Sequence, residues 1–236
     1  MEKYLIERSN LMQISMSADE AKDFALYHQM LIAANKDMNL TRIGDDISEA
    51  CDRNYLDSLT ALKYLKDEGT LLDVGSGAGF PGLPIAIMLR NCRVTLMDSL
   101  SKRVDFLNSV IRSLGLNASS VHLRCEEAAK NEAYREQFDF VTARAVASMT
   151  VLSEWLLPFV KIGGRMIALK GPGAEEECEE AAFAIKTLGG RLKTIDDALI
   201  PGRDWAHKIV VIEKAEPTPQ RFPRKAGIAE KRPLKA

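Results

Sequence analysis

The spacing of apolar residues changes after the first third of the chain, from a helical pattern to short apolar runs. In the first part, Ser17 and Asp19 precede apolar positions that recur every three to four residues over residues 21–32. This spacing predicts an amphipathic helix with a polar N-terminal cap. A second helix is expected over residues 47–65, after a loop at residues 35–46. The N-terminal segment is therefore expected to be helical and to contribute no strand.

From there on, short apolar runs alternate with stretches of helical periodicity. Seven runs are expected to form strands, at residues 70–74, 93–97, 120–124, 138–143, 164–169, 190–199 and 206–213. Helices are expected between the first six runs, at residues 81–90, 101–114, 126–136, 149–160 and 174–188. This alternation predicts an α/β fold in which helices cover both faces of a parallel sheet. The last connection is short and contains Pro201 and Gly202, so we expect a hairpin and an antiparallel last strand.

Composition excludes several classes of protein. No apolar run approaches the roughly 20 residues that a membrane-spanning helix requires, and the first residues are charged from position 2 onward. We therefore expect a cytoplasmic protein without a membrane partner. The cysteines are far apart and have no histidine at metal-ligand spacing, which argues against a metal site and against a disulfide framework. They are Cys51, Cys92, Cys125 and Cys178.

Positive charge is concentrated at the C-terminus of a chain whose net charge is −1. Residues 213–236 contain seven Lys or Arg and three Glu, an asymmetry that is typical of an interaction tail. After residue 216 the segment has four prolines and no periodicity, so it is expected to be extended or disordered until a partner binds.

Four glycines lie within eight residues directly after the first expected strand, in the sequence LLDVGSGAGFPG. Such a cluster indicates that the backbone comes close to a ligand. In an open parallel sheet, the loop after the first strand lies at the edge where ligands bind. Asp98 closes the second strand nineteen residues after Gly79, where a carboxylate can accept hydrogen bonds from both ribose hydroxyls of an adenosine. The loop is therefore expected to bind an adenosine-containing cofactor.

Two classes of cofactor fit this loop. Residues 77–82 satisfy the GxGxxG pattern of dinucleotide-binding proteins, which leaves open an oxidoreductase that uses NAD. Residues 73–79 match, at every fixed position, the acidic-x-G-x-G-x-G motif of the seven-stranded S-adenosylmethionine-dependent methyltransferases, which the chain also resembles in its reversed last strand. Asp73 supports the second class, because the cofactor carries an ammonium group that nearby negative charge favours. A P-loop is excluded, since no GK[ST] follows the glycines.

A longer set of motifs resembles the glucose-inhibited division protein B family and spans residues 39–227. The motifs are Asn39-Leu40-Thr41, Leu56-Asp57-Ser58, DVGSGAGFPG, Asp98-Ser99-Leu100-Ser101-Lys102-Arg103, Ala143-Arg144-Ala145, Leu169-Lys170-Gly171 and TPQRFPRKAG. The resemblance implies the α/β, seven-stranded, Rossmann-like fold of class I S-adenosylmethionine-dependent methyltransferases. It also implies methylation of ring nitrogen-7 of one guanine in small-subunit (16S) ribosomal RNA, with S-adenosyl-L-methionine as cofactor and this RNA or the 30S subunit as partner. We expect a helical N-terminal extension (residues 1–65), a methyltransferase core (66–214) and a basic, Pro-rich tail (215–236). We expect the tail to add a salt-sensitive contribution to RNA affinity.

The resemblance also implies which residues bind the cofactor. It assigns this role to Gly75, Phe80, Cys125, Glu126 and Arg144, and the geometry of the sheet adds Asp98. No catalytic residue is assigned, because nitrogen-7 of guanine already presents a lone pair and need not lose a proton.

The chain departs from the family pattern at two positions. Many members have a His in place of Asn54, and an Arg where this chain has His207; both differences concern contacts with RNA. Trp155 and Trp205 are interpreted as packing or surface residues, although an aromatic ring can also stack on bases. Besides the oxidoreductase, a non-catalytic RNA-binding assembly factor that keeps the cofactor pocket remains an alternative function.

Overall fold

The computed structural model describes residues 1–41, 43–44, 46–144 and 146–235. These residues form a seven-stranded sheet with the order β3-β2-β1-β4-β5-β7-β6. The strands are β1 (Gly69–Val74), β2 (Cys92–Asp98), β3 (Ala118–His122), β4 (Phe138–Arg144), β5 (Val160–Lys170), β6 (Gly190–Asp197) and β7 (Lys208–Lys214). β7 is antiparallel to β5 and β6, and the other pairs are parallel. The predicted sheet and its reversed last strand are confirmed.

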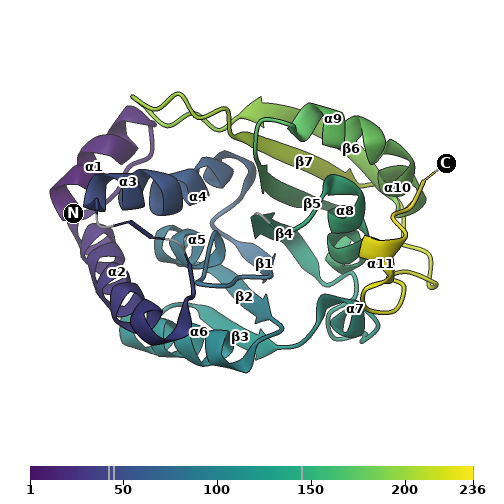
Figure 1. Cartoon of the computed structure of the whole chain (residues 1–236), viewed down its shortest axis with the longest axis horizontal. Coiled ribbons are helices and arrows are strands. Elements are labelled where there is room, and N and C mark those ends of the chain that lie inside the picture. The colour runs from purple at the N-terminus through teal and green to yellow at the C-terminus, as the bar shows by residue number, and fades with distance from the viewer. Residues whose placement is uncertain (42, 45, 145, 236) are drawn as a thin grey trace.

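Each face of the sheet is buried in its own hydrophobic cluster. Leu71 of β1 packs with side chains of α2 (Ala18–Met38), α5 (Gly82–Met88) and α6 (Ser101–Leu114). Its neighbour Leu72 packs on the other face, against the helices α8 (Met149–Leu156), α9 (Ala174–Glu180) and α10 (Ala182–Thr187). Successive strand residues point to opposite faces, so a strand covered on both sides is apolar at consecutive positions. Figure 1 shows the N-terminal helices on one side of the sheet and α8 to α10 on the other.

The N-terminal segment holds more helix than the sequence predicts. α2 extends the expected helix at both ends, and its cap residue Ser17 forms a capping box with Glu20. The pattern does not predict α1 (Glu2–Leu11), in which Leu5 and Ser9 are the buried positions, too few to give a periodic signal. No described helix has the length and apolar character of a membrane-spanning segment.

The second expected helix is a continuous run of four short segments. α3 (Ile47–Ala50) continues as the π-helix η1 (Cys51–Leu56), then as α4 (Asp57–Leu59) and as the 3₁₀ helix η2 (Thr60–Tyr64). A π-helical turn is rare and occurs frequently at functional sites.

Three predicted helices are shorter than expected. The prediction for residues 126–136 is wrong beyond α7 (Cys125–Ala128), because Asn131 Oδ1 accepts a hydrogen bond from Ala133 N at 2.9 Å and favours a turn instead. α8 passes into the 3₁₀ helix η3 (Leu157–Phe159), and Val160 already begins β5. The expected helix at residues 174–188 is interrupted at Ala181, between α9 and α10.

The expectation of an extended or disordered tail is wrong, because much of the C-terminal segment (residues 216–235) packs against the second cluster. Phe222 and Thr218 are buried, and α11 (Ile228–Lys231) contacts α8. Lys214, the last residue of β7, is buried and donates hydrogen bonds to Leu157 O at 2.6 Å and to Thr218 Oγ1 at 2.5 Å. Burial lowers the pKa of Lys214 to about 8. The division of the chain at residues 65 and 214 stays a prediction.

Gly82 allows α5 to lie close to β1 and β2. A Cβ atom at Gly82 would overlap the side chain of Leu96 and lie 2.8 Å from Asp73 Oδ2. We expect Gly82→Ala to lower the free energy of unfolding by about 1–3 kcal/mol, the usual cost of overpacking. Urea denaturation measures this change. Gly171→Ala is the matched control, because a Cβ atom there meets nothing within 4 Å. Equal stability of the two variants would contradict the packing argument.

Candidate functional site

The glycine loop, residues 75–81, connects β1 to α5 at the carboxyl edge of the sheet. Gly75, Gly77 and Gly79 have φ angles of +72°, +57° and +109°, a region that favours glycine. The backbone amides of Gly75 and Ser76 donate hydrogen bonds to Met97 O, at 2.8 and 3.1 Å, and fasten the loop to the end of β2. The glycines are therefore required first by the backbone conformation of the loop itself.

Two buried carboxylates hold this loop and the first residue of α5. Asp73 Oδ1 accepts a hydrogen bond from Thr142 Oγ1 at 3.0 Å, and Asp73 Oδ2 accepts one from Gly82 N at 3.3 Å. Asp98 Oδ2 accepts a hydrogen bond from Gly77 N at 2.8 Å. Burial raises the pKa of Asp73 to about 6, although its hydrogen bonds act in the opposite direction. The loop is thus positioned by charge as well as by the ends of the strands.

A cleft of about 370 Å³ lies beside the glycine loop. It is lined by four of the six residues predicted to bind a cofactor, namely Gly75, Asp98, Cys125 and Glu126. The volume falls within the range of small-molecule sites in proteins. Arg103, Trp155 and residues of the C-terminal segment also line the cleft, a role that neither the motifs nor the family resemblance predicts.

Cys125 and Glu126 begin α7 at one wall of this cleft. Cys125 Sγ donates a hydrogen bond to Glu126 Oε2 at 3.3 Å, and Glu126 Oε1 accepts one from Gly227 N at 3.3 Å. Burial and the neighbouring Glu126 raise the pKa of the Cys125 thiol. The thiol is therefore protonated at neutral pH and forms part of the wall of the cleft rather than acting as a nucleophile.

The other two predicted residues, Phe80 and Arg144, lie together outside the lining of the cleft. The Phe80 ring is buried, with its centroid 5.7 Å from that of Tyr27. The guanidinium carbon of Arg144 lies 4.7 Å from the Phe80 ring centroid. Arg144 donates hydrogen bonds to Arg53 O at 2.9 Å and to Asn54 Oδ1 at 3.3 Å, which ties the end of β4 to the π-helix. Ala145, part of the same motif, lies outside the described residues.

A cluster of polar and aromatic side chains continues from Arg144 toward the connection between β6 and β7. Asp57 bridges Arg144 and His207, at 3.3 Å from Arg144 Nη1 and 2.8 Å from His207 Nδ1. The His207 ring lies 5.5 Å from that of Trp205. The Trp205 ring in turn lies 4.6 Å from the guanidinium carbon of Arg53. The sequence identifies Asn54 and His207 only as departures from a family pattern, whereas the structure places both at this cluster.

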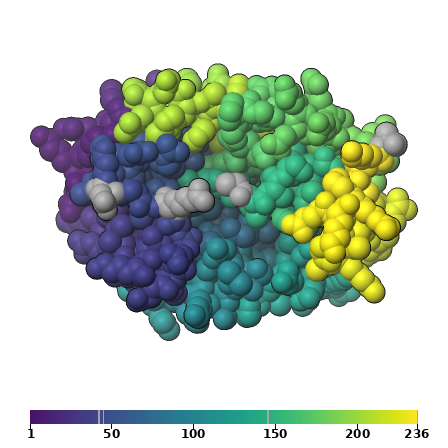
Figure 2. Space-filling view, viewed as in Figure 1, coloured from purple at the N-terminus to yellow at the C-terminus, as the bar shows by residue number. Residues whose placement is uncertain are grey.

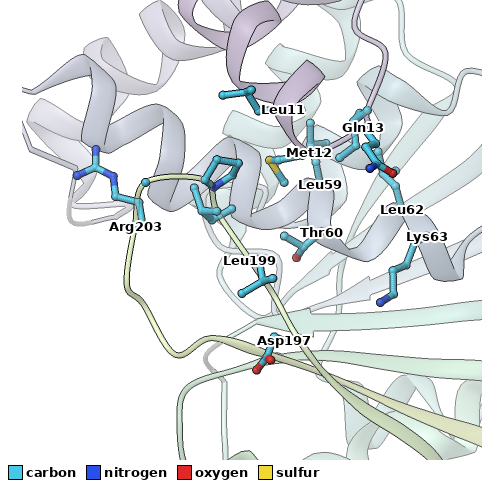
Figure 3. Close-up of a pocket in the computed structure, with 14 residues that line it drawn as sticks. Leu11, Met12, Gln13, Leu59, Thr60, Leu62, Lys63, Asp197, Leu199 and Arg203 are labelled. Atoms are coloured by element: carbon cyan, nitrogen blue, oxygen red, sulfur yellow. The ribbon is translucent and has the colours of Figure 1, made fainter.

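A larger cavity of about 900 Å³ lies elsewhere, between the end of α1, η2 and the β6–β7 connection. Figure 3 shows Leu11, Met12 and Leu59 among the side chains that line it. None of the six predicted site residues contributes to this lining. Within the residues that the structure describes, no group of three His, Cys, Asp or Glu side chains is placed to hold a metal ion.

Comparisons with known proteins agree on one family. The family model described as rRNA small subunit methyltransferase G (GidB) matches residues 20–204. A protein of Clostridium perfringens strain 13 named ribosomal RNA small subunit methyltransferase G is 47% identical over 94% of each chain. The protein of the same name from Alkaliphilus metalliredigens is 42% identical over the full length of both chains.

The fold is also similar to that of solved structures. A branched-chain polyamine synthase mutein from Thermus thermophilus, in complex with N4-aminopropylspermidine and 5'-methylthioadenosine, superposes with a TM-score of 0.58 and 14% identity. The match covers 81% of this chain and 64% of that one. The topology is that of class I S-adenosylmethionine-dependent methyltransferases, as the motifs predict.

Asp73 gives a prediction about pH. Because its folded pKa of about 6 lies above the ordinary value of 3.8, the folded protein binds an extra proton between about pH 4 and 6. The contribution of Asp73 to stability is therefore present at low pH and is lost as pH rises through 6. The difference in unfolding free energy between wild type and Asp73→Asn should shift by about 2–3 kcal/mol over this interval, in favour of wild type at low pH.

Asp139→Asn is the control for this measurement by urea denaturation at successive pH values. Burial acts to raise the pKa of Asp139, but hydrogen bonds from Thr70 and Lys161 outweigh it and lower the pKa below 3.8. Its stabilising contribution is thus lost as pH falls, so the Asp139→Asn difference should change with the opposite sign. A flat difference curve for Asp73→Asn would show that Asp73 titrates alike in the folded and unfolded chains.

Proposed function

The chain belongs to the rRNA small subunit methyltransferase G family, and on that premise we propose that it methylates nitrogen-7 of a guanine in small-subunit (16S) ribosomal RNA. The methyl donor is S-adenosyl-L-methionine, and the substrate is this RNA, bare or within the 30S subunit, in the cytoplasm. One observation carries the proposal: Gly75, Asp98, Cys125 and Glu126, from three separate strand ends, line a single cleft beside the glycine loop.

The cleft fits an adenosine-containing cofactor. A Cβ atom at Gly75 would lie 3.0 Å from Val146 Cγ1, which also lines the cleft. Glycine at this position therefore keeps a side chain from crowding the cleft. Asp98 offers a carboxylate to ribose hydroxyls, and Cys125 and Glu126 flank the base. Trp155 adds a buried indole Nε1–H that has no hydrogen-bond partner among the described residues. When bound, S-adenosyl-L-methionine supplies an electrophilic methyl group.

The chain's own contribution to the reaction is orientation. Nitrogen-7 of guanine has a free lone pair, so its methylation needs no general base. The residues have to hold this nitrogen in line with the methyl group and keep other atoms of the guanine away from it. The cluster around Arg144 is suited to the substrate side, because it adjoins the glycine loop through Phe80 without lining the cleft. We therefore move the proposed role of Arg144 from the cofactor toward the guanine, with Asp57 and Asn54 fixing its guanidinium.

Trp205 is placed to stack on a nucleotide next to the target. It is half-buried, and the guanidinium carbons of Arg53 and Arg203 lie 4.6 and 5.3 Å from its ring centroid. Aromatic and guanidinium planes are the groups on which unpaired bases stack in RNA-binding proteins. The Arg203 side chain is itself held by the buried Asp52, at 2.7 Å. Trp205 is predicted from the sequence to be a packing or surface residue, and we propose that it also binds RNA.

Trp205→Ala is expected to raise KM for the 30S subunit or 16S RNA about 5- to 100-fold, the value of one stacked base. The dissociation constant for S-adenosylhomocysteine should stay within about twofold, because Trp205 does not line the cofactor cleft. Phe183→Ala is the control, since Phe183 is an exposed aromatic side chain on α10. A KM for Trp205→Ala equal to that of this control would exclude stacking on Trp205.

The proposed activity is tested by incubating the purified protein with labelled S-adenosyl-L-methionine and either 30S subunits or bare 16S transcript. Mass spectrometry should find 7-methylguanosine at one position of the RNA. Label in another base, or only in protein, would defeat the proposal, and binding without turnover would favour the assembly factor. Calorimetry with S-adenosylhomocysteine and NADH side by side tests the oxidoreductase alternative, which requires that NADH bind.

A further inference from the structure

The C-terminal segment forms part of the wall of the cofactor cleft. Ala226, Gly227 and Glu230 line the same cleft as Gly75 and Asp98. Gly227 N donates its hydrogen bond to Glu126, a residue proposed above to flank the base of the cofactor. Figure 1 shows α11 close to α7 and α8, and Figure 2 shows the C-terminal residues across a central depression from the N-terminal helices. The wall therefore combines elements that are a hundred residues apart in the sequence.

Buried and partly buried charges hold the segment in this position. Glu154 on α8 is 1% exposed and accepts hydrogen bonds from Arg224 Nη2 at 2.6 Å, Arg224 Nε at 2.9 Å and Arg224 N at 2.8 Å. Arg135 donates to Thr218 O at 2.7 Å and to Phe222 O at 2.9 Å. Charge-assisted hydrogen bonds to buried groups are strong and costly to break. The docked position of the segment is thus specified by the fold.

Glu154 and Trp155 are adjacent on α8 and connect this anchor to the cleft. Glu154 holds the segment, while Trp155 lines the cleft with its indole N–H unpaired among the described residues. Buried indole N–H groups usually have a hydrogen-bond partner. A hydrogen-bond acceptor on a bound ligand would therefore pair with the Trp155 N–H, next to the residue that holds Arg224.

On the basis of the function proposed above, we propose that residues 224–230 belong to the S-adenosyl-L-methionine site, so that cofactor binding and docking of the C-terminal segment are coupled. A ligand that contacts only the docked arrangement stabilises it by mass action. Coupling is reciprocal, so release of the segment weakens the cofactor by the same factor. The segment then contacts the cofactor, whereas its basic composition alone points to RNA.

Limited trypsin digestion of the full-length wild-type protein tests the coupling without any substitution. Lys225 and Lys231 are exposed cleavage sites in the segment, and Lys66 is an exposed site before β1 that serves as internal reference. With S-adenosylhomocysteine at about 100 times its dissociation constant, cleavage at Lys225 and Lys231 should slow by about 10- to 100-fold. Cleavage at Lys66 should change by less than about twofold.

A pair of variants tests the reciprocal effect. Arg224→Ala removes the partner of Glu154, and we expect the dissociation constant for S-adenosylhomocysteine to rise about tenfold by calorimetry. Arg221→Ala is the matched control, because Arg221 is an exposed arginine three positions away that contacts only the face of Phe222 among the interactions the structure describes. Both variants lose one positive charge, so a difference between them reports docking rather than net charge.

The outcomes separate this inference from the function on which it rests. Normal binding of S-adenosylhomocysteine with unchanged cleavage of the segment, or with equal slowing at Lys66, would overturn the coupling and leave the proposed activity intact. Equal affinities of the Arg224→Ala and Arg221→Ala variants would also overturn it. If wild type does not bind S-adenosylhomocysteine at all, both proposals are wrong. If Arg224→Ala does not fold, the trypsin digestion of wild type alone tests whether cofactor binding and docking of the segment are coupled.

Discussion

The glycine loop depends on two buried carboxylates at the ends of neighbouring strands. Asp73 accepts hydrogen bonds from Gly82 N and Thr142 Oγ1, and Asp98 accepts one from Gly77 N. A carboxylate that is removed from water must find such partners, and here the amides of Gly77 and Gly82 and the Thr142 hydroxyl supply them. These hydrogen bonds hold the loop in its conformation and attach the first residue of α5 to β1. The substrate cluster attaches to the same loop through Phe80 and Arg144.

Two kinds of feature could be predicted from the sequence: burial of a strand on both faces, and the meeting of residues that follow parallel strands. Consecutive apolar residues such as Leu71 and Leu72 face opposite clusters, so a strand buried on both sides is visible in the chain itself. The same holds for the gathering of Gly75, Asp98, Cys125 and Glu126, because parallel strands bring their carboxyl ends to one edge. Their roles toward a cofactor remain predictions.

Contacts between residues far apart in the sequence could not be predicted from local patterns. The order of the C-terminal segment comes from Arg135 and Glu154, whose partners lie 70 or more residues away. A pattern of four prolines without periodicity carries no information about those partners. Likewise, Phe80 and Arg144 lie with the π-helix rather than in the cleft, because the wide turn of η1 brings Asn54 and Arg53 O to Arg144. Six residues are too few for the spacing of apolar positions to distinguish a π-helical turn from an α-helical one.

The reversal of β7 sets a minimum length for whatever follows it. β7 runs against β5, so Lys214 leaves the sheet at the edge opposite to the glycine loop. To return along seven residues of strand, at about 3.3 Å each, the chain needs at least about seven extended residues. The twelve positions between Lys214 and Gly227 provide this reach with a margin for the turns around Phe222. A relative with a much shorter terminus would have to close its cleft with another element.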